Sequence, residues 1–325
     1  MRTRRFIATG LALLLAATAC PVQAKDYPER PVRMIVPYPP GGAADVIARI
    51  FAQRLSEGFG GQFYIENLAG ASGATGTAAA ASAAPDGHTI LFVSPDLVVS
   101  PLLKTKVPYD PFSSFAPITL LVSSREIVAV HPSLGANSMS ELAALLKANP
   151  GKYGYATPGY GSLPHLKGER LFRLAYGLDV THVPFQGFGP AVSSTLAGHT
   201  SILVGTPLSL VAAHIKEGKL RGLAIDGNKR SATLPDVPTL AEAGAPDLGN
   251  AAWFGALAPA GTGRDVVELL QRQMKKIVSL PEVAERLATL GFDPVANTPD
   301  EFAAFTKSES AYWEKVVRES HLKID

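Results

Sequence analysis

The stretch Val32 to Leu55, VRMIVPYPPGGAADVIARIFAQRL, decides the fold. It opens with a short run rich in β-branched residues, which indicates a strand that ends near Pro37. Prolines and glycines occupy 39–42, and these two residue types together mark a tight turn. A helix is indicated next, because apolar residues recur with a period near 3.6 at Val46, Ile47, Ile50, Phe51 and Leu55. The stretch therefore predicts a strand, a small-residue turn and a helix.

The same order of strand, turn and helix returns along the chain. Turns rich in glycine, serine or proline follow predicted strands at 70–76, 94–96, 158–162 and 187–190. Strands that alternate with helices at this spacing favour an α/β fold, in which mostly parallel sheets are flanked by helices. The predicted strands lie at 63–66, 89–93, 118–122, 127–130, 153–157, 180–184, 201–204, 220–225 and 253–258.

Chain length indicates two lobes, because 325 residues exceed the size at which one hydrophobic core stops growing. The polar break at 123–125 marks the first crossing between the lobes, and a predicted strand over 253–258 returns. We expect both crossings to act as a hinge. The predicted first lobe holds residues 25–123 and 229–325, and the second holds 124–228. A closing amphipathic helix, placed to contact both lobes, is marked by Phe302, Phe305, Trp313 and Val316.

The N-terminus has the pattern of a secretory signal. Three arginines at 2–5 precede an apolar run over 7–19, and small residues at 22–24 suit cleavage after Ala24. The apolar run is too short for a membrane span, which needs about 20 residues. Cys20 leaves lipid attachment as a less favoured alternative. We therefore expect an exported protein whose segment 1–24 is removed.

Charge and cysteine content exclude several classes of protein. Without residues 1–24 the chain has 27 basic and 28 acidic residues, a balance of −1. Neither a nucleic-acid partner nor a polybasic membrane attachment is expected. Cleavage after Ala24 also removes the single cysteine, so disulfides and thiolate catalysis are not expected. His131, His165 and His182 are interpreted as structural hydrogen-bonding residues, and we expect no metal and no cofactor.

Small-residue turns between strand ends and helix starts indicate that the protein binds an anion. In an open α/β sheet, ligands bind beyond the carboxyl ends of the strands, where helix starts present unpaired N–H groups and a partial positive charge. At any single turn, the glycines can also be explained without a ligand, because glycine permits a tight bend of the backbone. Several such turns on two lobes of an exported protein favour a clamp for a small anion.

Ordered motifs run through nearly the whole chain after Lys25. In these motifs the chain resembles the solute receptors of tripartite tricarboxylate transporters, also called Bug-type receptors. The resemblance implies a two-lobed periplasmic binding protein fold of type 2, whose lobes close over a small organic acid and deliver it to membrane transporter subunits. The motifs are YPERP (27–31), VPYPPGG (36–42), PDG (85–87), PYD (108–110), GYGS (159–162), HVPF (182–185), LPDVPT (234–239), WFG (253–255) and APAGT (258–262).

The same resemblance implies the residues that surround the ligand. In the first lobe these are Tyr38, Pro40, Gly41, Gly42, Ala43 and Asp45, then Ala71, Ser72 and Gly73, and finally Ser94. In the second lobe they are Thr157, Gly161, Ser162, Phe188 and Asp226. The chain departs from the family at Leu68-Ala69, where Arg-Pro is usual, at Gln186, often Lys, and at Ser201, often Asp.

Asp226 is a further departure, since the family has Thr or Ser there. We expect the end of its strand to point into the cleft, where an acid would repel a ligand carboxylate or select an ammonium or hydroxyl group. Asp45 is expected either to order the first turn or bridge the lobes, or else to cap the start of its own helix. Trp253 and Phe254 are interpreted as packing residues.

Alternatives remain for function. A ligand-sensing partner of a regulatory system would use the same clamp as a transport receptor. A secreted hydrolase with Ser162 as nucleophile is a remote alternative, because the chain lacks the G-x-S-x-G order of a nucleophile elbow. The ligand candidates are dicarboxylates, tricarboxylates, aromatic acids and acidic amino acids. We expect a monomeric binding protein that is not an enzyme.

Overall fold

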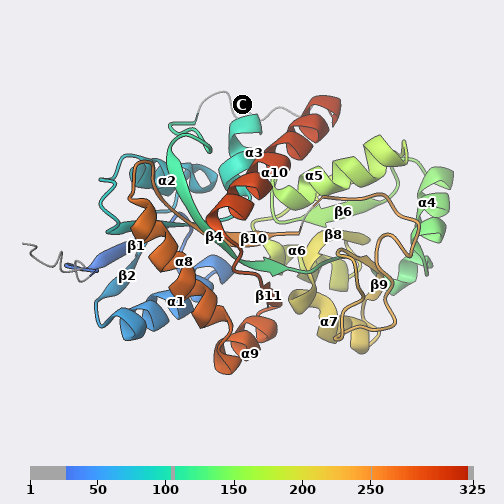
Figure 1. The fold of residues 1–325 in the computed structure, drawn as a ribbon. Coiled ribbons are helices and arrows are strands. Elements are labelled where there is room, and N and C mark those ends of the chain that lie inside the picture. Colours follow the sequence, from blue (N-terminus) through green and yellow to red (C-terminus); the bar gives the residue numbers. More distant parts are fainter. Residues whose placement is uncertain (1–26, 104–106, 250, 321–325) are drawn as a thin grey trace, which may run out of the picture.

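The computed structural model describes residues 27–103, 107–249 and 251–320, which form two lobes side by side (Figure 1). Each lobe contains one β-sheet flanked by helices, as the sequence predicts. The predicted signal segment 1–24, the cleavage point after Ala24 and Cys20 lie outside the described residues. Among the described residues, no helix is both long and apolar enough to cross a membrane.

The first sheet has six strands in the order β11-β4-β10-β3-β1-β2. Strands β1, β2 and β3 are parallel, whereas β10 is antiparallel to both β3 and β4, and β11 is antiparallel to β4. Strand β4 therefore runs in the direction of β1, β2 and β3. The bounds are β1 (Val32–Val36), β2 (Phe63–Asn67), β3 (Thr89–Val93), β4 (Phe115–Ser124), β10 (Trp253–Pro259) and β11 (Phe292–Pro294).

Alternate side chains of β1 are buried on opposite faces of this sheet, as period-2 strand geometry requires. Met34 and Val36 pack in the core formed with α1 (Ala43–Phe59), α8 (Arg264–Val278) and α9 (Pro281–Thr289). Ile35 packs in the core on the other face. That core also contains α2 (Ala74–Ala81), α3 (Asp96–Leu103) and α10 (Pro299–Ser320).

The second sheet has five strands in the order β7-β6-β8-β5-β9. Strands β6, β7 and β8 are parallel, and β5 is antiparallel to both of its neighbours. The core on one face includes α4 (Met139–Ala148) and a π-helix (Glu169–Ala175) that follows α5 (Leu163–Gly168), and α6 (Phe188–Leu196) and α7 (Leu208–Lys216) cover the other face. The strands are β5 (Glu126–Val130), β6 (Gly154–Thr157), β7 (Thr181–Pro184), β8 (Ile202–Pro207) and β9 (Arg221–Ile225); two short 3₁₀ turns span Ala71–Gly73 and Pro132–Leu134.

The chain passes from the first sheet to the second through Arg125. Strand β4 ends at Ser124 and β5 begins at Glu126, which is where the sequence predicts a crossing. The returning segment lies beside it, because the amide of Ser124 donates to the carbonyl of Ala252 at 2.7 Å. Two neighbouring antiparallel segments therefore connect the lobes. The second lobe extends beyond the predicted boundary at 228, because Leu234 and Leu240 pack in the cores of the second sheet.

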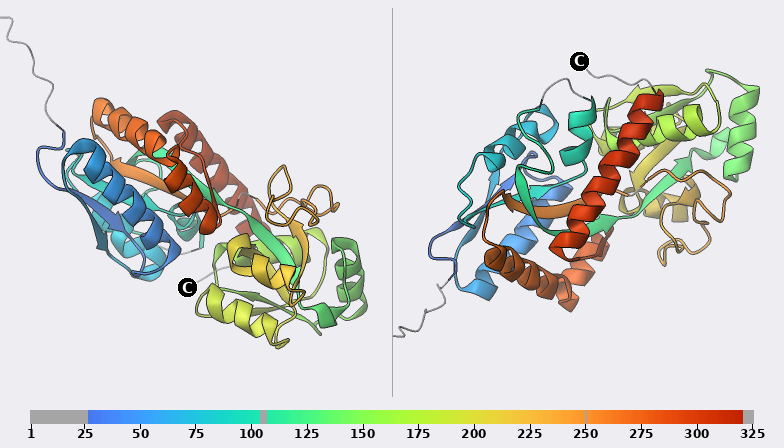
Figure 2. Two further views of the ribbon diagram at one scale, coloured as in Figure 1. Left: turned by 90° about the horizontal axis from the view of Figure 1, so that it is seen from below. Right: turned by 45° about the horizontal axis from the view of Figure 1, so that its top comes forward.

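The last helix, α10, contacts elements of both lobes. Its Phe302 and Trp313 are fully buried, and they share one core with Leu163 and Leu166 of α5. Figure 2 shows α10, in red, running from the first lobe past the second. The aromatic residues that mark a closing helix in the sequence therefore pack between the two lobes.

Close packing at Gly255 in β10 gives a test of this core. A Cβ atom there would lie 2.3 Å from Cζ of the buried Phe302 and 3.1 Å from the carbonyl oxygen of Thr119. We expect Gly255→Ala to lower the free energy of unfolding by about 1–3 kcal/mol, the usual cost of overpacking. Gly58→Ala is the control, because Gly58 is an exposed residue of α1. A Cβ atom there would meet only the side chain of Gln273, at 3.7 Å. Urea unfolding of both variants checks this; equal stability would contradict the packing described.

Candidate functional site

Strand directions bring the predicted turns of the two lobes toward each other. Strand β4 runs toward the second lobe, so the carboxyl ends of the parallel strands β1, β2 and β3 point the same way. Strand β5 continues away from the first lobe, and β6, β7 and β8 run opposite to it. Their carboxyl ends therefore point back toward the first lobe. This arrangement places the turns of both sheets on facing edges.

Asp45 orders the first turn. Its carboxylate is buried and accepts the amide of Gly41 at 3.0 Å and Nε of Arg49 at 2.9 Å. The side-chain amide of Asn67 donates to the other carboxylate oxygen at 2.9 Å. Burial alone would raise the pKa of Asp45, but these hydrogen bonds lower it below the usual value. With its oxygens engaged in this way, Asp45 positions the turn.

The start of α1 is open to solvent. Pro40, Gly41, Gly42 and Ala43 are all exposed, and Gly42 is the N-cap residue without a side-chain hydrogen bond to the helix. The first amides of a helix have no carbonyl four residues earlier to bond. The amide of Ala43, the first helical residue, is therefore placed to donate to an anion.

Three separate turns of the first lobe meet at Tyr38. Its hydroxyl lies 2.5 Å from Oγ of Ser94, which follows β3. A Cβ atom at Gly73, where φ is +87°, would lie 3.5 Å from the Tyr38 ring, so the 71–73 turn packs closely there. Burial raises the pKa of Tyr38 well above its ordinary value. Ala71 is exposed, and the Ser72 side chain lies outside the described part of the structure.

The turn after β6 is held by its own hydrogen bonds. Ser162 caps α5: its hydroxyl donates to the carbonyl of Gly159 at 2.7 Å and accepts the amide of His165 at 3.4 Å. Gly161 has φ of +72°, and its amide donates to Nδ1 of His165 at 2.9 Å. Thr157 is buried, with Oγ1 at 2.7 Å from Nε2 of His182. The bond to the Gly159 carbonyl uses the single hydroxyl proton of Ser162.

His165 and His182 form a stacked pair beneath this turn. Their ring centroids are 3.8 Å apart and their planes differ by 9°. Burial lowers the pKa of His165 to about 3 and that of His182 to about 4, so both rings are neutral near pH 7. Because Nδ1 of His165 accepts an amide proton, its own proton is on Nε2. Both histidines thus serve as hydrogen-bonding parts of the turn.

Other predicted residues take packing or edge positions. Phe188, the first residue of α6, is half-buried. Trp253 is 1% exposed, and Phe254 stacks on Phe92 with ring centroids 5.4 Å apart. His131 accepts the amide of Ser133 at 3.3 Å. Among the described residues, no group of three His, Cys, Asp or Glu side chains is arranged to hold a metal ion.

The contacts of Ser162 do not form the nucleophile and base pair of a hydrolase. Its hydroxyl oxygen meets the backbone amide of His165, while Nδ1 of the imidazole is engaged by Gly161. A general base must instead reach the hydroxyl proton with a ring nitrogen. The remote hydrolase alternative therefore receives no support from this geometry.

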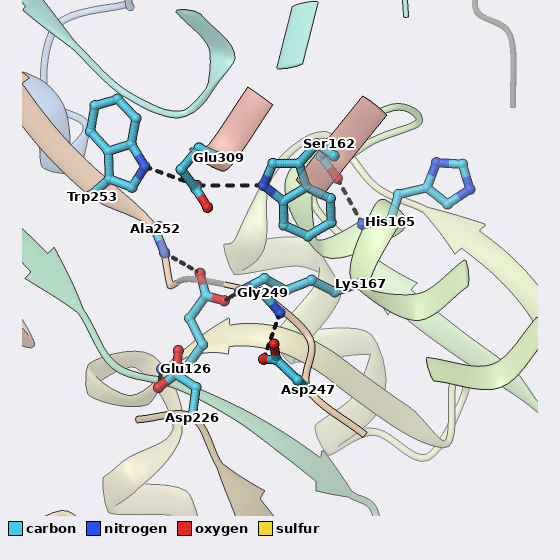
Figure 3. A network of polar contacts seen from close by, with 11 residues as sticks. Glu126, Ser162, His165, Lys167, Asp226, Asp247, Gly249, Ala252, Trp253 and Glu309 are labelled. Atoms are coloured by element: carbon cyan, nitrogen blue, oxygen red, sulfur yellow. Dashed lines mark hydrogen bonds and ion pairs between the residues drawn. The ribbon is translucent and has the colours of Figure 1, made fainter. Parts of the chain in front are cut away.

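Asp226 lies in a buried charge cluster at the hinge, shown in Figure 3. Its Oδ1 accepts the amide of Glu126 at 2.8 Å, and its Oδ2 is buried without a hydrogen-bond partner. Glu126 is ion-paired with Lys167, and both side chains are at most 3% exposed. The other carboxylate oxygen of Glu126 accepts the amide of Ala252 at 3.0 Å. The cluster thus joins α5 to both hinge segments.

Burial raises the pKa of Asp226 to about 7; Lys167 opposes the shift, and the charge of Glu126 adds to it. Sequence reasoning missed Glu126, Lys167 and Glu309, which accepts Nε1 of Trp253 at 3.2 Å. The available signals were charged residues inside apolar segments: Glu126 opens an apolar strand and Lys167 follows Leu166 in a helix.

A groove of about 710 Å³ lies beside this cluster. We call it the hinge groove. Of the predicted ligand residues, Asp226 lines it, whereas the turns at 40–43, 71–73 and 157–162 do not. Its lining includes Ser124, Asp226, Asp247, Asp293, Val295 and Phe305. The hinge groove is therefore distinct from the facing turns.

Two α/β lobes, joined by antiparallel segments and carrying strand-end turns on facing edges, define a solute-binding receptor of the periplasmic binding protein class. A family model described as the tripartite tricarboxylate transporter family receptor matches residues 47–322. Protein BugT of Bordetella pertussis is 37% identical over 324 residues, which cover 99% of either chain. The chain belongs to the tripartite tricarboxylate transporter receptor family.

Solved structures agree with this assignment. A protein of R. palustris solved with adipate has a TM-score of 0.79 at 30% identity, covering 91% of this chain and 99% of that one. A second Rhodopseudomonas palustris protein, with bound malate, has a TM-score of 0.75 at 29% identity, covering 90% of this chain and 100% of that one. The predicted family and the two-lobed fold are confirmed.

Asp226 gives a pH-dependent stability prediction. Its folded pKa, about 7, lies above the ordinary 3.8, so the folded state holds the proton more tightly than the unfolded chain. The contribution of protonated Asp226 to the free energy of unfolding is fully present below the ordinary pKa of 3.8. It is lost as pH rises from there through 7, by at most about 1.4 kcal/mol for each pH unit. We expect Asp226→Asn to remove this decline. The free energy of unfolding of the variant should therefore exceed that of the wild type by the largest amount at about pH 8.

Urea unfolding across this pH range measures the effect. Asp300→Asn is the matched control, because it makes the same chemical change on a side chain that is 90% exposed. An Asp226→Asn variant whose stability follows the wild type at every pH would show that Asp226 is not the titrating group.

Proposed function

We propose that this receptor binds a small organic carboxylate between the facing turns of its lobes and delivers it to the membrane subunits of a tripartite tricarboxylate-type transporter. The observation that carries the proposal is the pair of facing strand-end edges, with the exposed start of α1 on one of them. The similar proteins solved with adipate and malate support a carboxylate as the ligand class.

Backbone groups must hold most of the ligand charge at these turns. The segments 39–42, 70–73 and 157–162 contain no Lys or Arg. Arg49 is the nearby cation on α1, and its guanidinium is already bonded to Asp45. An anion there meets amides, hydroxyl groups and bridging water, and a helix start contributes only about 0.3–1 kcal/mol by charge alone. Several donors must therefore converge on one carboxylate.

Ligand binding on both edges would favour a closed arrangement of the lobes. The two connecting segments at Ser124 and Ala252 are the hinge about which the lobes move in this proposal. The mature receptor begins at Lys25 in this proposal, and N-terminal sequencing of the exported protein checks that start; an intact Met1 or a lipid-modified Cys20 would contradict it.

A comparison of an acid with its amide tests the charge of the ligand. A thermal-shift screen of small acids that includes adipate and malate identifies a ligand, since one at 100 times its Kd stabilises by about 2.7 kcal/mol. Calorimetry then compares that acid with its amide at low and high salt. We expect the acid alone to bind, with a shallow salt dependence because the pair is shielded from solvent ions. Equal affinity for the amide would defeat the proposal.

A proline at position 43 localises the carboxylate. Proline is tolerated at the first helical residue, and Gly42 has the extended backbone that suits a residue before proline, with φ of −78° and ψ of 169°. Ala43→Pro thus removes one N–H while α1 remains folded. We expect about a tenfold or greater loss of affinity, as for a hydrogen bond to a charged group. Ala43→Ser keeps the N–H and is the control; equal binding by both variants would place the ligand elsewhere.

A further inference from the structure

The hinge groove lies on the flank of the hinge that faces away from the turns. In the first sheet, β4 has β11 on one side and β10, β3, β1 and β2 on the other. In the second sheet, β5 has β9 on one side and β8, β6 and β7 on the other. The groove is lined by Asp293 of β11 and by Asp226 directly after β9. A ligand in it would not share the site proposed for the carboxylate.

Two buried polar atoms beside the groove have no hydrogen-bond partner. They are Oδ2 of Asp226 and Oγ of Ser124, whose side chains belong to residues that are 8% and 3% exposed. Both residues line the groove. A buried carboxylate oxygen without a hydrogen-bond donor is unfavourable, and a ligand that donates a hydrogen bond to it removes this penalty. When Asp226 is ionised, its Oδ2 needs a ligand group that donates hydrogen bonds, and Oγ of Ser124 can accept from the same group.

The charges around the groove favour a cation. Its lining holds three carboxylates, from Asp226, Asp247 and Asp293, and the guanidinium of Arg125. Arg125 is already engaged, because its Nε donates to Asp293 at 2.8 Å and its Nη1 donates to the carbonyl of Lys229 at 2.8 Å. The lining thus retains an excess of negative charge, which opposes an anionic ligand.

Charges behind Asp226 add to this excess. Lys167 is ion-paired with Glu126, so its ammonium already has a carboxylate partner. Glu309 of α10 is also buried near Lys167, where it accepts the indole N–H of Trp253. The buried cluster behind the groove therefore holds two further carboxylates and one ammonium, of which Glu126 and Lys167 act on Asp226.

Apolar side chains form another part of the groove. Val295, which is 43% exposed, and the half-buried Phe305 of α10 line it together with Leu120 and Leu240. A concave site of this volume with apolar walls and a few convergent polar groups is typical for a small organic molecule. The ligand should therefore carry an apolar body as well as its donor group.

We propose that the hinge groove is a second binding site, which takes a small amphipathic amine. Its ammonium group donates to Asp226 and Ser124, and its aliphatic or aromatic body packs against Val295 and Phe305. The lining combines strands β4, β10 and β11 of the first sheet with residues that follow β9 of the second, so occupancy of the groove depends on the angle between the lobes. The site goes beyond carboxylate binding and does not require it.

The protonation of Asp226 supports a pH signature for this site. An ammonium ligand favours the ionised carboxylate, so its affinity should rise as pH rises through about 7. The charged groups that act on Asp226 are Glu126, Lys167 and Arg125, Asp247 and Asp293 line the same groove, and Glu309 lies behind them near Lys167. We expect Asp226→Asn to lose this pH dependence together with the affinity.

Calorimetry with 2-phenylethylamine tests the proposal directly. The neutral 2-phenylethanol and the anionic 3-phenylpropionate share its aromatic body and are the ligand controls. We expect saturable binding of the amine, at least about tenfold weaker binding of the alcohol, and at least about tenfold loss of amine affinity in Asp226→Asn. Asp300→Asn is the variant control and should bind the amine as the wild type does.

Several outcomes would overturn the second site. These are the absence of saturable amine binding by the wild-type protein, equal binding of the alcohol, or unchanged amine affinity in Asp226→Asn. If Asp226→Asn does not fold, Ser124→Ala and the pH dependence of wild-type binding decide instead. Ala43→Pro should bind the amine normally, so that failure of the carboxylate proposal and failure of this one are separable. Amine binding lost in Ala43→Pro would place the amine at the facing turns and contradict the proposal.

Discussion

The buried ion pair between Lys167 and Glu126 is the interaction on which the arrangement of the lobes depends. Lys167 belongs to α5, Glu126 opens β5, and the second oxygen of Glu126 holds the amide of Ala252 in the returning segment. Removal of one partner from a buried pair typically costs about 3–5 kcal/mol, because the other charge stays buried alone. Since α5 begins at the Ser162 cap, the same pair also fixes the second-lobe turn to the hinge.

The fold was largely predictable because its signals are local. The proline and glycine turn at 39–42 and the helical spacing that follows give β1 and α1, and the polar break at 123–125 gives the point where the chain changes sheets. Strand β11 was not predicted, because three residues carry too little periodicity to indicate a strand. It exists because β4 offers an unpaired edge, a tertiary condition that no local pattern reports.

The site was predictable in its backbone and less so in its side chains. Glycine and serine turns could be placed from sequence, since strand ends and helix starts are visible in the pattern. The sequence left the role of Asp45 open between alternatives, because the choice depends on Asn67, a residue 22 positions away in the chain. Asp226 needs still more distant partners, as it meets Glu126 across 100 positions. Such contacts arise from packing and leave no periodic trace.

Arg125 has a mechanical consequence for the receptor. It is the single residue between β4 and β5, and its guanidinium holds Asp293 of the first lobe and the Lys229 carbonyl that follows β9. A residue that is hydrogen-bonded to both lobes at their junction acts as a fulcrum, that is, a fixed point about which the lobes rotate. Displacement about a fulcrum grows with distance from it, so a small rotation moves the far turns, such as that at Phe188, much more than the neighbouring Asp226. The hinge region can therefore keep its dense packing while the outer ends of the lobes travel.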